Sequence, residues 1–268
     1  LSLDRTNWKF GEVNINILML GVTYKGVAFP LLFTLLDKRG NSNWQERTQL
    51  IDRFIRLFGA ECIDSLVADR EFVGKQWVEY LNNRRIRYYL RIKQNFWLRN
   101  PKSCQDVRAW HLFHGLKLGQ ERVYDKLFLL KGEYVYIAGA MLKNSDGVPE
   151  LQILICYNRP EAAVATYKQR WQIETCFRAM KSSGFNIEDT HLRDIDRIAR
   201  LTAMVCVALV WAYLVGEHKD RNVKSIRILK HGKRAKSLVK YGLEEITNVL
   251  LRPLYKQKFD VFKFLSCT

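Results

Sequence analysis

Residues 167–181, which read YKQRWQIETCFRAMK, are the stretch around which the rest of the sequence is organised. Arg170, Glu174 and Lys181 follow Tyr167 by three, seven and fourteen positions. At about 100° per residue, a helix would bring these four side chains into an arc of about 60°. A carboxylate would then be flanked on one ridge by a phenol, a guanidinium and an ammonium.

Two interpretations of this ridge are open. Most charge patterns of this kind are solvated helix faces with salt bridges between neighbouring turns. However, Trp171, Phe177 and Met180 alternate with the charges, so much of the helix should be packed. A buried carboxylate needs a partner or a metal ion. This requirement favours a functional role for Glu174.

The charge balance points to a polyanionic partner. Among 268 residues, 44 are Lys or Arg and 27 are Asp or Glu, which gives a formal net charge of +17. Such an imbalance favours nucleic acid over a membrane surface. Six cysteines without CxxC spacing suggest neither a zinc ribbon nor a disulfide framework, and a reducing, cytoplasmic compartment is expected.

No membrane partner is expected. Residues 201–215 are almost entirely apolar, but this run is shorter than the ~20 residues needed to span a bilayer. We therefore predict a buried core helix there. The sequence starts at Leu1 without a methionine, in what reads as the middle of a strand, so a piece of a longer protein is expected.

The first hundred residues predict a mixed sheet with two helices. Residues 1–8, 13–24 and 27–36 read as three strands of an antiparallel meander. A helix over residues 43–58, a short buried strand over 65–69 and a second helix over 74–83 follow. The strand over 65–69 ends on Asp69, as a buried parallel strand does when it delivers a residue to the sheet edge.

Residues 86–93 alternate with period two and have one basic face. That face carries Arg87, Tyr89, Arg91 and Lys93, whereas the other face is apolar. The pattern predicts a strand at an edge of the sheet or along a groove. Its arginines and lysine either protect an edge strand against aggregation or contact nucleic acid directly.

The remaining sequence divides into a β-rich insertion and a helical region. Short strands are expected at 127–130, 134–141 and 151–156, with no helix between residues 100 and 158. Pro160 opens the helical region that holds Glu174, and Gly184 closes it. Residues 194–216 and 225–251 also read as helical, and residues 224–240 are strongly basic. The predicted organisation is thus a core in two parts, 1–99 and 159–268, with the insertion 100–158 between them.

The order of these elements brings three carboxylates together. A meander followed by parallel crossovers gives a mixed five-stranded sheet in which the first and fourth strands are neighbours. Asp4 and Asp69 would then be adjacent, and Glu174 could fold back over the same sheet end. Converging carboxylates repel one another unless cations lie between them, and oxygen-only ligands suit Mg²⁺ or Mn²⁺. Two such ions ~4 Å apart can catalyse displacement at a phosphodiester.

Three motifs resemble those of a known enzyme family. LSLDRTNW at 1–8, VADREF at 67–72 and the Y-x2-R-x3-E-x6-K helix resemble the motifs of bacterial insertion-sequence transposases of the DDE type, in the branch with the Y-R-E-K signature. The resemblance implies an α/β fold with an RNase H-like catalytic core, interrupted by a β-rich insertion before the last catalytic helix. It also implies double-stranded DNA as substrate, at transposon ends and target, and a homodimer in the DNA complex.

The resemblance assigns roles to individual residues. It implies that Asp4, Asp69 and Glu174 bind two Mg²⁺ or Mn²⁺ ions. It implies that Tyr167, Arg170 and Lys181 hold DNA phosphates near the scissile bond. Arg87, Arg91 and Lys93 remain DNA-binding candidates from the strand pattern alone.

The sequence departs from the family pattern in two places. Family members usually have a small residue where Glu71 stands, which leaves a fourth carboxylate near the site without an explanation. The helical DNA-binding region that normally precedes the first aspartate is also missing. Two other functions stay open, a metal-dependent nuclease without strand transfer and a decayed DNA-binding protein. The three intact acids argue against the second, because a pure binder gains nothing from acids that face phosphates.

Overall fold

The structure is a computed structural model that describes residues 1–10, 13–36, 38, 40–182, 184–190, 192–230, 232–252 and 260–266. The chain forms two compact units. One comprises Leu1–Asn7 with Asn16–Glu174, and the other comprises Trp8–Ile15 with Thr175–Thr268. Asp4, Asp69 and Glu174 all belong to the first unit.

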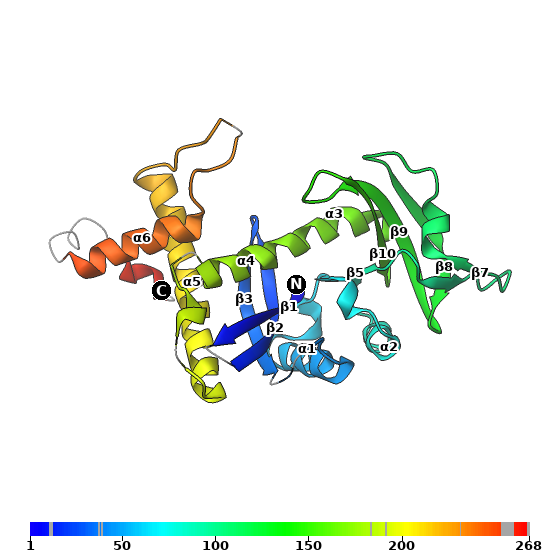
Figure 1. Cartoon of the computed structure of the whole chain (residues 1–268), viewed down its shortest axis with the longest axis horizontal. Helices are drawn as coiled ribbons and strands as arrows, with labels where there is room; N and C mark the ends of the chain where they lie inside the picture. Colours follow the sequence, from blue (N-terminus) through cyan, green and yellow to red (C-terminus); the bar gives the residue numbers. More distant parts are fainter. Residues whose placement is uncertain are drawn as a thin grey trace. The chain divides into compact units, whose positions relative to one another are not determined.

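In the described part of the chain, ten strands form one sheet in the order β3-β2-β1-β4-β5-β10-β9-β8-β6-β7 (Figure 1). The strands are β1 (Ser2–Phe10), β2 (Val13–Tyr24), β3 (Val27–Leu36), β4 (Leu66–Ala68), β5 (Tyr88–Ile92), β6 (Trp97–Arg99), β7 (Asp106–Arg108), β8 (Glu121–Leu130), β9 (Glu133–Lys143) and β10 (Pro149–Cys156). The mixed α/β architecture agrees with the expected fold class.

The parallel centre of the sheet is as predicted. β1 pairs in parallel with β4, with Leu3 opposite Ala68, and β4 pairs in parallel with β5. The predicted adjacency of the first and fourth strands is therefore confirmed. Because Asp4 follows Leu3 within β1 and Asp69 follows Ala68 at the end of β4, the two aspartates occupy the position next to the last paired residues.

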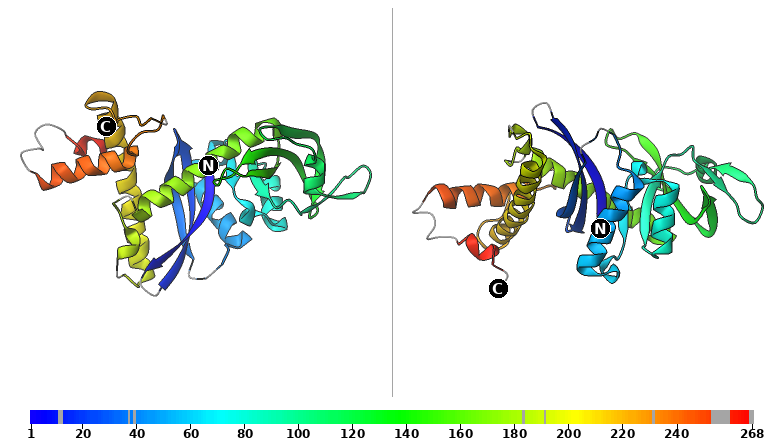
Figure 2. Two further views of the ribbon diagram at one scale, coloured as in Figure 1. Left: turned by 45° about the horizontal axis from the view of Figure 1, so that its top comes forward. Right: turned by 90° about the horizontal axis from the view of Figure 1, so that it is seen from below.

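The predicted strand count of five is wrong for the complete sheet. The strands of residues 100–158 do not form a separate layer, because β10 pairs antiparallel with β5 from Ile153↔Ile92 to Cys156↔Tyr89. Through this pairing, the insertion strands β10, β9 and β8 continue the sheet beyond β5 (green in Figure 2). The three strands expected in the insertion are present and longer than predicted.

The predicted edge position of residues 86–93 is also wrong, because β5 lies between β4 and β10. Arg91, the basic residue on β5, is tolerated inside the sheet because it has a partner. Arg91 forms an ion pair with Glu150 on β10, and Arg87 lies 3.1 Å from the Asp64 carboxylate. Tyr89, on the same face, is buried.

The two faces of the sheet are covered by different helices (Figure 1). Helices α1 (Trp44–Phe58) and α2 (Lys75–Asn83) pack in one hydrophobic cluster with Leu66 and Ala68. Helix α3 (Ala163–Tyr167) packs in another cluster with Val67. Successive β4 residues thus face opposite sides of the sheet, and both sides are covered. A strand in this position needs an apolar residue at every position, which is why it reads as a continuous apolar run.

The start of α1 confirms the capping signal in the sequence. The Asn43 side chain accepts a hydrogen bond from the Glu46 backbone at 2.9 Å, and the Glu46 carboxylate accepts one from the Asn43 backbone at 2.7 Å. This reciprocal capping box satisfies two backbone donors of the first turn. Gly59 ends the helix with a φ of 87°, a conformation that favours glycine.

The helical path to Glu174 is not one continuous helix. A 3₁₀ turn, η4 (Pro160–Ala162), precedes α3, and a second one, η5 (Lys168–Arg170), separates α3 from α4 (Trp171–Ser182). In a 3₁₀ turn, side chains three residues apart eclipse one another. The 3₁₀ turn therefore makes the Tyr167 and Arg170 side chains point in more similar directions than a regular α-helix would.

The second unit is built around α5 (Ile195–Asn222) and α6 (Leu238–Leu251). The two helices approach closely at Gly216 and Gly242, where a Cβ on Gly242 would lie 1.8 Å from the Ala212 carbonyl oxygen. The predicted helix over 225–251 begins only at Leu238, and an isolated bridge joins Ile228 and Arg234 before it. Most of the basic stretch 224–240 is therefore non-helical.

The apolar helix predicted over residues 201–215 is present but longer and less buried than expected. α5 has 28 residues, and 44% of its most apolar window is buried. Met204 and Val207 are 69% and 62% exposed. By length and composition, α5 is the one described helix that could cross a membrane. Within the second unit it packs on α6, to which Lys219 is joined by an ion pair with the buried Glu245.

Candidate active site

Asp4 lies on β1 with only 14% of its side chain exposed. Its Oδ1 accepts a hydrogen bond from the Arg5 backbone at 2.7 Å, and its Oδ2 lies 3.5 Å from Arg170 Nη1. Burial raises the pKa of Asp4 to about 7, and the negative charges of Glu71 and Glu174 act in the same direction. The hydrogen bond and Arg170 oppose this shift but do not cancel it. The surroundings of Asp4 thus neutralise its negative charge only in part.

Asp69 directly follows the buried strand β4 and is the N-cap residue of the 3₁₀ turn η2 (Arg70–Phe72). Its Oδ1 accepts a hydrogen bond from the Tyr167 hydroxyl at 3.2 Å. Tyr167 is 4% exposed, and burial, together with the Asp69 charge, raises its pKa well above the usual value. The phenol therefore remains protonated and acts as a donor to Asp69.

Arg170 links the other two acids. Its Nη2 lies 2.6 Å from Glu174 Oε1, and its Nη1 reaches Asp4. Burial lowers the pKa of Arg170, but Tyr167 and Glu174 outweigh burial, so the pKa is raised and the guanidinium stays charged. Arg170 is 12% exposed and serves as an internal counter-ion between the two carboxylates.

Five of the predicted site residues lie together in the first unit: Asp4, Asp69, Tyr167, Arg170 and Glu174. The Tyr167–Asp69 pair meets the Asp4–Arg170–Glu174 set where the Arg170 guanidinium lies 5.8 Å from the centre of the Tyr167 ring, which makes one connected group. Lys181 belongs to the second unit, where its Nζ lies 3.4 Å from Glu188 Oε1.

The basic strand residues have other surroundings. Arg87 donates to Asn158 at 3.0 Å as well as to Asp64, and Arg91 pairs with Glu150. Lys93 is exposed. The Arg91–Glu150 ion pair thus ties β10 to β5, and Arg87 ties the residue before β5 to Asp64 and Asn158. These are structural roles that the alternation pattern did not reveal.

The three acids have the type of donor atom that a divalent metal ion requires. Asp4, Asp69 and Glu174 offer only oxygen donors, the set that Mg²⁺ and Mn²⁺ prefer. Within the described residues, however, no three Asp, Glu, His or Cys side chains are grouped closely enough to hold an ion. The Arg170 guanidinium already lies against two of the acids. The residues therefore fit a metal by chemistry, provided that Arg170 gives up at least one of these contacts.

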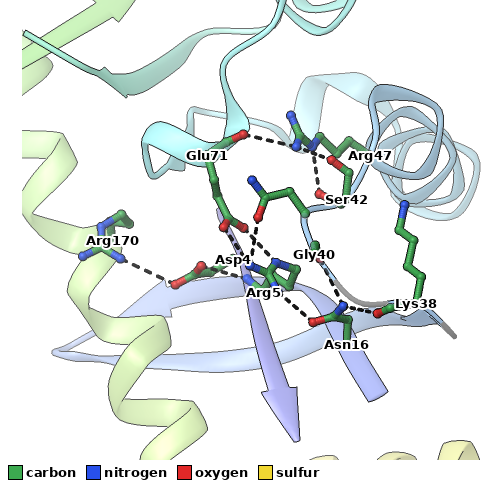
Figure 3. A network of polar contacts seen from close by, with 10 residues as sticks. Asp4, Arg5, Asn16, Lys38, Gly40, Ser42, Arg47, Glu71 and Arg170 are labelled. Carbon is green, nitrogen blue, oxygen red and sulfur yellow. Dashed lines mark hydrogen bonds and ion pairs between the residues drawn. The ribbon is translucent and has the colours of Figure 1, made fainter. Parts of the chain in front are cut away.

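One pair beside the site was not recognised in the sequence. Arg5 donates from Nε and Nη2 to the two oxygens of Glu71, at 3.1 and 3.0 Å (Figure 3). The unexplained fourth carboxylate thus has a cation of its own. The signal was present in LDRT and DREF, because each motif contains a charged residue close to a site aspartate.

Comparison with known proteins identifies the family. The family model described as transposase DDE domain matches residues 34–211, about two thirds of the chain. The chain therefore belongs to the transposase DDE domain family. Membership indicates an enzyme of the transposase type with DNA as its substrate. Asp69 and Glu174 lie within the matched residues, and Asp4 lies outside them. No curated protein matches the sequence.

Proposed function

We propose that this chain is the catalytic domain of a bacterial insertion-sequence transposase of the Y-R-E-K branch. It would cut phosphodiester bonds at transposon ends and join the freed 3′-OH to target DNA. The observation that supports this most is the connected group in which Tyr167 holds Asp69 and Arg170 links Asp4 to Glu174. Family membership adds the DNA substrate.

In this proposal, Asp4, Asp69 and Glu174 hold two Mg²⁺ or Mn²⁺ ions, which supply charge stabilisation and an activated oxygen nucleophile. Tyr167 fixes the orientation of the Asp69 carboxylate through its hydroxyl. Arg170 turns from the acids to the scissile phosphate, which its planar fork can bind through two hydrogen bonds. The acids would then hold the metal ions, and the arginine would hold the phosphate.

We also propose the form of the DNA, the oligomeric state of the protein and its location. The DNA would be double-stranded, at transposon ends and target, and the active complex would be a homodimer in the bacterial cytoplasm. A net charge of +17 supports binding to a long polyanion. Arg87, Arg91, Lys93 and Lys181 are proposed as additional phosphate contacts.

A cleavage and joining assay on labelled transposon-end DNA with Mg²⁺ tests the proposal. Cleavage followed by joining supports the transposase. Cleavage without joining indicates a nuclease on the same core, and DNA binding without cleavage indicates a decayed binding protein.

Arg170→Lys tests the phosphate contact separately. Lysine keeps the charge but loses the two-point geometry, and a phosphate displaced by ~1 Å can lower the rate about a hundredfold. We expect the cleavage rate at saturating DNA to fall by at least about tenfold, with the melting temperature changed by about one or two degrees. If stability falls and the rate holds, Arg170 is a salt-bridge residue only.

A further inference from the structure

The Arg5 side chain is almost fully engaged. In addition to its two bonds to Glu71, Nη1 donates to Asn16 Oδ1 at 2.7 Å (Figure 3). Nη2 also donates to Asn41 Oδ1 at 3.1 Å. A guanidinium has five N–H donors, and four of them are used in these contacts. With 17% of its side chain exposed, Arg5 has little capacity left for a DNA phosphate.

Glu71 is engaged to the same degree. Both of its carboxylate oxygens accept from Arg5, and its backbone carbonyl accepts from Arg47 Nη2 at 3.2 Å. A paired, bidentate carboxylate is a poor candidate for an additional metal ligand, because metal binding would leave Arg5 buried without its counter-ion.

The pair is anchored to elements on both sides. Asn16, on β2, is 1% exposed and donates to the carbonyls of Lys38 and Gly40. Arg47, near the start of α1, donates to Ser42 Oγ at 2.9 Å. Burial lowers the pKa of Arg47 to about 10, although it remains protonated at neutral pH. The network therefore joins β1, β2, α1 and η2 around the Arg5–Glu71 pair (Figure 3).

This position is next to both aspartates of the proposed site. Arg5 directly follows Asp4 on β1, and Glu71 lies two residues after Asp69. Between Leu3 and Ala68 the strands are held by backbone pairing, but that register ends before the two aspartates. The Arg5–Glu71 fork is the next connection between the two segments along the chain.

We propose that Arg5 and Glu71 are positioning residues that set the separation of Asp4 and Asp69 for metal binding. This inference rests on the proposed function. In this role neither residue would bind metal or DNA itself. The pair acts through the two aspartates, as outer hydrogen-bond partners orient metal ligands elsewhere. Because its two charges cancel, the pair fixes geometry without adding net charge to the site.

Three variants and a control test the inference by Mn²⁺ binding, measured from the electron paramagnetic resonance signal of free Mn²⁺. The variants are Arg5→Lys, Glu71→Gln and the double variant. The control is Arg99→Lys, because Arg99 forms a similar two-bond fork with Asp106, at 2.9 and 3.1 Å, in the same unit. Melting temperatures are measured in parallel, and Glu71→Asp replaces Glu71→Gln if the latter does not fold.

We expect Arg5→Lys and Glu71→Gln each to weaken Mn²⁺ binding by about tenfold. The double variant should bind Mn²⁺ no more weakly than either single variant, because all three variants break the same Arg5–Glu71 connection. The control should bind Mn²⁺ as the wild type does. The Mg²⁺ concentration for half-maximal cleavage should rise in the same variants.

Other outcomes overturn the inference in distinguishable ways. Weaker Mn²⁺ binding in Glu71→Gln but not in Arg5→Lys would make Glu71 a direct ligand. Unchanged Mn²⁺ binding in both variants with lower melting temperatures would make the pair a purely structural bond. If the wild type neither binds Mn²⁺ nor cleaves DNA, the proposed function fails, and the inference fails with it.

Discussion

Replacing Asp4 by asparagine should abolish DNA cleavage and, in metal-free buffer, stabilise the protein above neutral pH. Asp4 is buried with its charge only partly compensated, and its pKa is raised to about 7, mainly by burial. Asparagine has nearly the same shape and retains an oxygen to accept the hydrogen bond of the Arg5 backbone. The substitution therefore removes the charge and little else.

The sign and size of the effect follow from this pKa. In the unfolded chain Asp4 loses its proton near pH 4, whereas in the folded protein it retains the proton up to about pH 7. Between these values the folded state binds more protons, so the free energy of unfolding falls as the pH rises. A shift of about three units corresponds to about 4 kcal/mol, and structural relaxation makes about 1–3 kcal/mol a realistic expectation.

Thermal unfolding in EDTA at pH 4.5 and pH 8 measures the effect. At about 2–4 °C per kcal/mol, Asp4→Asn should raise the melting temperature at pH 8 by several degrees, and most of this gain should disappear at pH 4.5. Asp146→Asn, in the exposed turn between β9 and β10, is the matched control and should show no such pH dependence. A gain that is equal at both pH values, or a loss at pH 8, would refute the reasoning.

Three further predictions address other parts of the chain. Asp69→Ala should abolish Mg²⁺-dependent cleavage while DNA binding and melting temperature stay near normal, and near wild-type cleavage would reject the two-metal hypothesis. Gly242→Ala should lower the free energy of unfolding of the second unit by about 1–3 kcal/mol in urea titrations, because its Cβ would clash with the Ala212 carbonyl; unchanged stability would contradict this helix crossing. Replacing both Arg227 and Lys230 by glutamine should reduce the slope of log K against log salt by about two if both contact phosphates. An unchanged slope would mean that these side chains are only solvated.

Local signals in the sequence were sufficient for much of the fold. The capping box of Asn43 and Glu46, the apolar run that ends on Asp69 and the turn-separated meander each depend on neighbouring residues. The adjacency of β1 and β4 followed from the order of these elements. Segment 225–237 shows the limit of local composition, because Gly232, at a φ of 79°, and the N-cap Ser237 break a stretch that otherwise reads as helical.

Pairings between distant residues could not be predicted. The basic face of β5 indicated an edge strand because its partner Glu150 lies almost sixty residues further along the chain. An ion pair across two strands makes an arginine acceptable at the centre of a sheet, and alternation alone does not reveal the pair. For the same reason, the residues of the site group were predicted, but the contact of Arg170 with Asp4 was not.

The electrostatics of the site explain why Arg5 and Glu71 occur as a pair. Glu71 alone would raise the pKa of Asp4 further, since its negative charge already acts in that direction. Arg5 alone would place a second cation beside Asp4 and would compete with any metal ion for that carboxylate. As a bidentate pair, the two residues satisfy each other and leave Arg170 as the cation in contact with Asp4 and Glu174. Under the proposed function, Arg170 releases the acids by turning its side chain away from them. The Arg5–Glu71 pair then preserves the spacing of the aspartates while Arg170 moves from the acids to the phosphate.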